Sequence, residues 1–149
     1  MFGFDKAPPL ARNALLALAY IATGWLGLRI PSIGAHITLV WLPSGVAIAA
    51  LFLWGGGRWP GVYLGAFLVN LAIGSSWQLA GAIAVGNTLA PFLAAHALER
   101  SGFNRQFERR RDVGLFISIA TVSMTLSASG GVLSLWAAGL LPGSAIISA

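Results

Sequence analysis

The stretch Val40-Trp41-Leu42-Pro43-Ser44-Gly45-Val46 stands inside an apolar run that is long enough to cross a lipid bilayer. This run covers residues 37–54, and a helix of that length extends about 27 Å, close to the thickness of the hydrocarbon core. A proline within it leaves the carbonyl group four residues earlier without its usual donor. The stretch therefore predicts a membrane-spanning helix that Pro43 bends or interrupts.

The composition of the whole chain excludes an ordinary water-soluble domain. Of the 149 residues, 57% are hydrophobic and 9% are charged, and the mean hydropathy is +0.81. Such a chain lacks the polar residues needed to cover a surface in water. The absence of cysteine excludes disulfides and thiolate metal sites. The formal net charge of +5 does not indicate nucleic acid as a partner, because the basic residues lie between the apolar runs, where topology signals of membrane proteins are found.

Four further apolar runs have lengths typical of membrane helices or slightly shorter. Together with the run at residues 37–54, they make five runs. In chain order these cover residues 13–30, 37–54, 60–73, 79–98 and 113–138. We therefore predict an all-α transmembrane bundle of at least five spans. Residues 1–12 form a cytoplasmic segment in this interpretation, and residues 13–149 form the membrane domain. The apolar pattern resumes at Leu140, so we expect a domain truncated at its C-terminal end; a short sixth helix ending at Ala149 is the alternative.

The basic residues predict the orientation of the bundle. If successive runs alternate in direction, one membrane face receives eight lysines and arginines, and the other receives only Arg29. The eight are Lys6, Arg12, Arg58, Arg100, Arg105, Arg109, Arg110 and Arg111. The positive-inside rule then places the N-terminus in the cytoplasm. The polar loop 99–112 is also cytoplasmic, either as a topology anchor beside anionic lipid or as a docking surface for a cytoplasmic partner.

The polar groups within the apolar runs do not form a recognisable catalytic site. No Asp, Glu, Lys or Arg lies in the middle of a run, which argues against an ion pump or a proton relay. His36 and His96 fall on opposite membrane faces, so they cannot share a metal ion. We therefore expect no enzymatic activity, no cofactor and no metal site within this chain.

Neutral polar residues instead gather in the outer half of the predicted membrane domain. We predict a ligand pocket there, which opens outward and is reached from three helices. Its residues are Trp41, Ser44, Asn70, Asn87 and Thr88. The alternative is that Pro43 makes only a structural kink and that the two asparagines form hydrogen bonds between helices.

Glycines at 57, 61 and 65 are spaced four residues apart. On a helix, Gly61 and Gly65 make a smooth stripe that a neighbouring helix can approach closely. Close packing within the bundle is one interpretation of this stripe, and a homodimer contact is the other.

Taken together, the motifs resemble those of the membrane-associated sensor (MASE) family, type one. The resemblance covers residues 13–120. The elements that carry it are Trp41-x-Pro43-x-Gly45, the turn from Gly55 to Arg58-Trp59-Pro60-Gly61, Gly65, Asn70 and Gly86-Asn87-Thr88. Pro91 departs from the pattern and is expected to kink the fourth helix.

The resemblance implies a sensory input domain in the bacterial inner membrane. Such a domain precedes a cytoplasmic histidine kinase, diguanylate cyclase or phosphodiesterase module, so the expected partners are the lipid bilayer, an output module and a second copy of the chain. Two other functions remain open from the residues alone. One is a small-solute transport component, which needs alternating access and usually has internal repeats, and we find no convincing repeat in the sequence. The other is a membrane anchor or dimerisation platform without a ligand.

Overall fold

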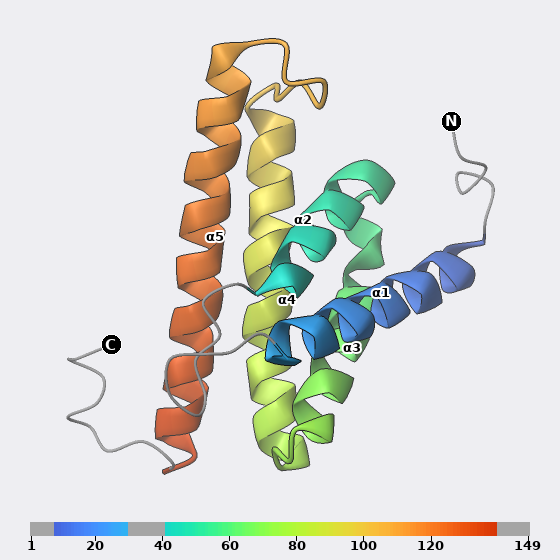
Figure 1. The fold of residues 1–149 in the computed structure, drawn as a ribbon, viewed down its shortest axis with the longest axis vertical. Coiled ribbons are helices and arrows are strands. Elements are labelled where there is room, and N and C mark those ends of the chain that lie inside the picture. The colour runs from blue at the N-terminus through green and yellow to red at the C-terminus, as the bar shows by residue number, and fades with distance from the viewer. Residues whose placement is uncertain (1–7, 30–40, 140–149) are drawn as a thin grey trace.

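The computed structural model describes residues 8–29 and 41–139, and every secondary-structure element assigned in those ranges is a helix (Figure 1). The elements are α1 (Pro9–Arg29), α2 (Leu42–Trp54), the short 3-10 helix η2 (Gly56–Arg58), α3 (Trp59–Ala72), α4 (Trp77–Arg100) and α5 (Arg110–Ala137). The all-α class is confirmed. Within the described residues, α4 and α5 are long and apolar enough to cross a bilayer, and α2 is a shorter apolar helix. The number of spans and the orientation remain predictions.

The beginning of α2 corrects one expectation from the sequence. Pro43 does not bend the middle of a longer helix, because α2 begins at Leu42 and the proline lies in its first turn. There the missing N–H is not needed, since the first four N–H groups of a helix have no partner inside the helix. Residues 37–40 of the predicted run, and the predicted sixth helix from Leu140, lie outside the described residues.

The ends of the other helices follow from local sequence. Gly55 ends α2 with a φ of 85° and Gly74 follows α3 with a φ of 94°, a region of backbone conformation that favours glycine. Pro60 lies in the first turn of α3. Ser76 caps α4, since its hydroxyl oxygen accepts a hydrogen bond from the Leu79 N–H at 3.3 Å.

The core of the structure lies among the first four helices. α4 contacts α2 and α3 on one side and α5 on the other, whereas α1 packs on α2 and α3 and lies at an oblique angle to α4 (Figure 1). The main apolar cluster includes Leu16 and Tyr20 of α1, Leu51 of α2 and Val62 of α3. By contrast, only 6% of the membrane-length window of α5 is buried, against 44% for α4. α5 is therefore a peripheral helix attached through α4.

Glycines allow α1 and α3 to approach each other closely. A Cβ atom added at Gly61 would lie 2.6 Å from the carbonyl oxygen of Asn13, and one added at Gly65 would lie 2.7 Å from the Cβ of Tyr20. Neither position has room for any larger residue without a shift of α1. The glycine stripe thus faces a neighbouring helix of the same chain, and its close approach holds Tyr20 in the core.

Candidate functional site

Tyr20 is the centre of a buried polar cluster in the bundle. Its side chain has 0% exposure, and it comes from the middle of α1. The indole Nε1 of Trp41 donates a hydrogen bond to the Tyr20 hydroxyl at 3.4 Å. The side chain of Asn87 in α4 forms a second hydrogen bond with Tyr20. The hydroxyl of Tyr20 therefore connects the residue that precedes α2 with the middle of α4.

Asn87 extends this cluster to the peripheral helix. Its Oδ1 accepts a hydrogen bond of 2.6 Å from the hydroxyl of Ser127 in α5. The four residues Trp41, Tyr20, Asn87 and Ser127, which we call the polar chain, link α1, the N-terminus of α2, α4 and α5. None of them carries a charge near neutral pH, so the cluster avoids the cost of a buried ion in an apolar environment.

The backbone around Asn87 is adapted to close contact with α5. Gly86 and Gly130 face each other, because a Cβ added at Gly86 would lie 3.5 Å from the Cα of Gly130. Pro91 lies inside α4 and is fully buried. Since it has no N–H, it removes the intrahelical donor for the carbonyl group of Asn87. Asn87 is thus the residue of α4 where both the side chain and the backbone have polar groups available to neighbouring elements.

The other predicted ligand residues form hydrogen bonds within their own helices or are simply buried. The Asn70 Nδ2 donates to the carbonyl oxygen of Ala66 at 2.8 Å, and the Thr88 hydroxyl donates to that of Ala84 at 2.7 Å. Ser44 is buried in the first turn of α2. The structure therefore brings Trp41 and Asn87 together through Tyr20, but the hydrogen bonds it gives Asn70 and Thr88 do not join them to the same cluster.

Two of the cavities in the described part of the chain lie elsewhere, and none of the five predicted ligand residues lines either of these two. The larger, of about 540 Å³, lies at the α4–α5 loop and is lined by Phe52, Leu53, Gly102, Phe103, Asn104, Arg105 and Arg109. The smaller, of about 260 Å³, is an apolar groove between α4 and α5. Ser123 lines that groove, and its buried hydroxyl has no hydrogen-bond partner among the described residues.

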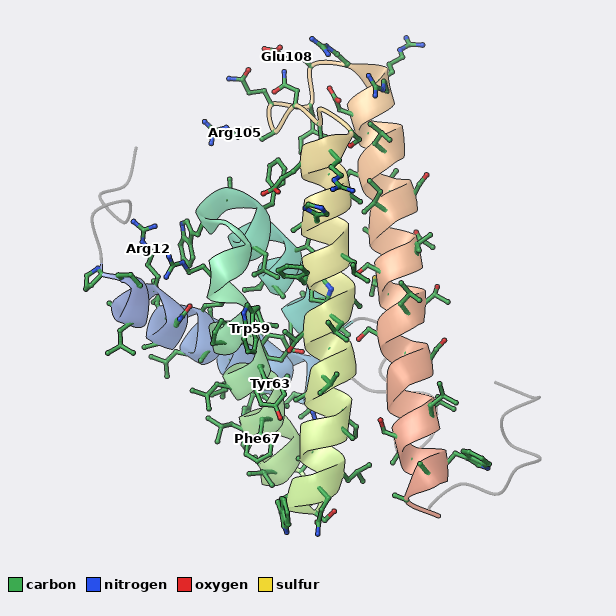
Figure 2. All side chains as sticks on the ribbon, turned by 180° about the vertical axis from the view of Figure 1, so that it is seen from behind. Arg12, Trp59, Tyr63, Phe67, Arg105 and Glu108 are labelled. Atoms are coloured by element: carbon green, nitrogen blue, oxygen red, sulfur yellow. The ribbon has the colours of Figure 1, made fainter. Side chains whose placement is uncertain are left out.

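The residues of the motif between α2 and α3 hold helix ends together. The Arg58 Nη1 donates to the carbonyl oxygen of Pro9 at 3.2 Å and so ties η2 to the start of α1. Trp59 is 49% exposed and lies at the start of α3 (Figure 2). Gly45 differs from Gly61 and Gly65, because a Cβ added there meets no atom within 4 Å.

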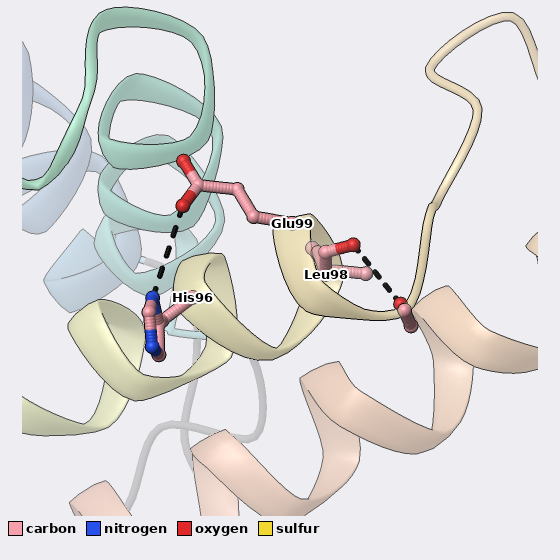
Figure 3. A network of polar contacts seen from close by, with 4 residues as sticks. His96, Leu98 and Glu99 are labelled. Atoms are coloured by element: carbon pink, nitrogen blue, oxygen red, sulfur yellow. Dashed lines mark hydrogen bonds and ion pairs between the residues drawn. The ribbon is translucent and has the colours of Figure 1, made fainter.

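The end of α4 carries the one ion pair found among the described residues. His96 Nδ1 and Glu99 Oε2 are 3.8 Å apart, and the Ser101 hydroxyl donates to the carbonyl oxygen of Leu98 at 3.0 Å (Figure 3). Both members of the pair are about half exposed, so this pair contributes little to stability. His36 lies outside the described residues, and the part of the chain that the structure describes has no group of residues suited to a metal ion.

The comparison with protein families agrees with this helical architecture. The model of the MASE1 family matches residues 11–149, which is nearly the whole chain. The chain belongs to the MASE1 family. MASE1 domains are membrane sensory domains of signalling proteins, and the resemblance recognised in the sequence is thereby confirmed. The comparisons with curated proteins and with solved structures give no match.

Sequence reasoning missed the central residue of the polar chain in this MASE1 chain. Tyr20 lies in an apolar run, where a single phenol gave the only signal, and its partner Trp41 is 21 positions away. Ser127 belongs to a serine-rich face of the fifth run that carried no specific information, because serine often bonds to its own helix. Both residues become visible only when the packing of α1 and α5 against α4 is known.

Proposed function

We propose that this MASE1 chain is the sensory input domain of a bacterial signal-transduction protein in the inner membrane. It crosses the membrane several times and passes its signal to a cytoplasmic output module of the histidine kinase or diguanylate cyclase type. That module acts either in cis or as a docked partner. In this proposal the chain itself carries no catalytic activity, in line with the sensory role of the family.

The polar chain is the observation that carries this proposal. It connects four segments through hydrogen bonds between side chains, and its bond between Asn87 and Ser127 is the polar contact between α4 and α5. A hydrogen bond between membrane helices contributes about 0.6 kcal/mol on average. Such a bond is weak enough to exchange partners when a signal favours a second packing arrangement. We propose that α5 changes its position on α4 when the polar chain rearranges.

The signal in this proposal is a neutral polar ligand or a change in packing at the outer half of the domain. Trp41, Ser44, Asn70, Asn87 and Thr88 remain the proposed ligand-facing residues, with Tyr20 added as the residue that joins two of them. An uncharged set of hydroxyl, amide and indole groups suits such a ligand better than an ion.

A chimaera with a diguanylate cyclase module tests the function. The chain is placed before the cyclase, and cyclic di-GMP is measured in cells together with the amount of protein in the membrane. Asn87→Leu is expected to change output about threefold, which corresponds to the loss of about 0.6 kcal/mol of bias between two states. Thr121→Val is the matched control, because the Thr121 hydroxyl donates to the Ile117 carbonyl of its own helix and is not one of the proposed ligand-facing residues.

An unchanged output of the cyclase would contradict a sensory role. If Asn87→Leu inserts normally and leaves output the same as that of the Thr121→Val variant, the polar chain does not bias signalling. If removal of the whole membrane domain also leaves output unchanged, the chain acts as an anchor only.

A further inference from the structure

We propose that the cavity at the α4–α5 loop binds the phosphate-bearing headgroup of an anionic phospholipid. This site is separate from the polar chain and independent of the proposed signalling role. It combines a folded loop, two arginines without carboxylate partners among the described residues and two apolar side chains at the end of α2.

The loop between α4 and α5 has a defined fold of its own. Asn104 makes three hydrogen bonds within this loop. Its backbone N–H donates to Asp112 Oδ1 at 3.3 Å, and its side-chain Nδ2 donates to Glu108 Oε2 at 3.1 Å. Its Oδ1 accepts from the Gln106 N–H at 3.0 Å. The Arg111 Nη2 donates to the carbonyl oxygen of Ser101 at 3.0 Å. These contacts hold Asn104 against two acids of the loop, and neither acid lies within ion-pair distance of an arginine among the described residues.

A cluster of four phenylalanines attaches this loop to the bundle. Phe103 contacts Phe52 of α2 at a ring-centroid distance of 5.5 Å and Phe107 at 5.1 Å, and Phe107 contacts Phe116 of α5 at 5.6 Å. Phe107 has a φ of 56°, a conformation that residues with large side chains rarely adopt. The ring contacts keep it there. The loop is consequently held in one position over the end of α2.

Two guanidinium groups line the cavity that this arrangement creates. Arg105 and Arg109 are among its lining residues, together with Asn104 and Gly102. Figure 2 shows Arg105 on the side of the loop that extends over α2. Neither arginine pairs with a carboxylate, since the ion pair of the described residues joins His96 and Glu99. Arginine offers planar, paired donors that match the oxygens of a phosphate group, so an anionic phosphate fits this cavity.

An exposed apolar side chain beside the arginines favours a lipid over a soluble phosphate. The lining of the cavity is mostly polar, and its apolar part includes Phe52 and Leu53 in the last turns of α2, where Leu53 is 54% exposed. The cavity is open on its outer side, so a ligand larger than a phosphate group can extend out of it. A phospholipid has its phosphate group next to apolar acyl chains. The cavity likewise has its arginines next to the exposed side chain of Leu53. Basic residues at the membrane surface also attract anionic lipids.

Retention of phosphatidylglycerol tests this proposal. The full chain in mild detergent is mixed with equal amounts of phosphatidylglycerol and phosphatidylcholine, and the bound lipids are counted by native mass spectrometry. The wild type is expected to retain one phosphatidylglycerol selectively. Arg105→Gln with Arg109→Gln is expected to weaken that retention at least about tenfold, because two charge-assisted hydrogen bonds are lost.

The matched control removes the same charge from the same region. Arg100→Gln with Arg110→Gln loses two exposed arginines that do not line the cavity, and it is expected to retain the lipid as the wild type does. Leu53→Ser is expected to weaken lipid retention without changing the binding of glycerophosphoglycerol, the soluble headgroup. Circular dichroism establishes that each variant keeps its helical content.

Three results overturn the proposal. Equal losses in the two double variants mean that only the overall charge attracts lipid. Glycerophosphoglycerol that displaces the lipid at an equal concentration means that the ligand is a soluble phosphate. A poly-glutamate peptide that binds this cavity while phosphatidylglycerol does not means that the partner is an acidic protein segment.

Discussion

At the scale of single residues, Asn87 uses the two halves of one amide group for two different helices. Its Oδ1 accepts from Ser127, so its Nδ2 is the group available to Tyr20. The Tyr20 hydroxyl in turn accepts from the Trp41 indole. A hydrocarbon side chain at position 87 would leave the hydroxyls of Tyr20 and Ser127 without these partners. The buried position of the cluster makes such a loss more costly than at a surface.

A double-mutant cycle measures the bond between Asn87 and Ser127. We expect Asn87→Leu and Ser127→Ala to be coupled by about 0.6–1.7 kcal/mol, the range found for hydrogen bonds between membrane helices. The free energy of unfolding in detergent micelles is the measured quantity. Thr88→Val combined with Ser127→Ala is the control and is expected to show no coupling. Additive effects of Asn87→Leu and Ser127→Ala would contradict the observed bond.

Gly65 makes a second prediction at the residue scale. We expect Gly65→Ala to lower the free energy of unfolding by about 1–3 kcal/mol, because the new methyl group overlaps the Cβ of Tyr20. Gly45→Ala is the control, since its methyl group meets no atom within 4 Å and alanine favours the helix. Thermal unfolding of the two variants in the same detergent decides the matter. Equal stability would mean that α1 can move away from α3 without cost.

At the scale of helices, the register of α5 on α4 sets which residues of the two meet. The contact of Gly86 with Gly130 brings the helices together, and the bond between Asn87 and Ser127 lies beside it. α5 is otherwise little buried, and its main described contact is with α4. A shift of α5 by one turn, about 5.4 Å, would separate both pairs.

Disulfide trapping tests this register in a chain that has no cysteine of its own. We expect Asn87→Cys with Ser127→Cys to form a disulfide on mild oxidation, because the two side chains are in direct contact. Leu89→Cys with Ser127→Cys is expected to remain reduced, since Leu89 is 53% exposed and points away from the packed core. Gel mobility of a chain cleaved between the two helices reports the link. Efficient trapping of the Leu89 pair instead would require a different register.

The sequence predicted the helices well but not the contacts between them. Pro60 and the glycines after Trp54 located the turn between α2 and α3, because these residues have local backbone effects. The first and fifth helices begin a few residues earlier than predicted, at Pro9 and Arg110. The predicted bend at Pro43 was wrong, because the sequence alone does not show whether a helix continues through a proline or begins beside it.

The sequence predicted only part of the candidate site, because the bonds of the site depend on how the helices pack. Its hydrogen bonds join residues 21 and 40 positions apart. Such bonds depend on how helices pack, whereas Asn70 and Thr88 found acceptors within their own helices. A polar residue in an apolar run can bond either to its own helix or to a neighbouring helix, and the sequence does not distinguish the two.

At the scale of the whole molecule, the lengths of the helices separate α4 and α5, which are long enough to cross a bilayer unaided, from the shorter α2 and α3. α4 and α5 have 24 and 28 residues, and at about 1.5 Å per residue both exceed the hydrocarbon core of about 30 Å. α2 and α3 have 13 and 14 residues, or about 20 Å each. They cross completely only with local thinning of the bilayer or with help from neighbouring residues. The alternative is a hairpin that enters the membrane and returns to the same side.

Reporter fusions distinguish a crossing from a re-entrant hairpin. We expect fusions after Arg58 and after Arg105 to be cytoplasmic and a fusion after Ser76 to be periplasmic, because eight of nine lysines and arginines then lie inside. Alkaline phosphatase is active only outside the cytoplasm, and green fluorescent protein fluoresces only inside, so the two reporters check each other. The Ser76 and Arg105 fusions flank α4 and test the long helix. The Arg58 fusion is the decisive one: a periplasmic result there, with the other two as expected, would mean that α2 and α3 form a hairpin that does not cross the membrane.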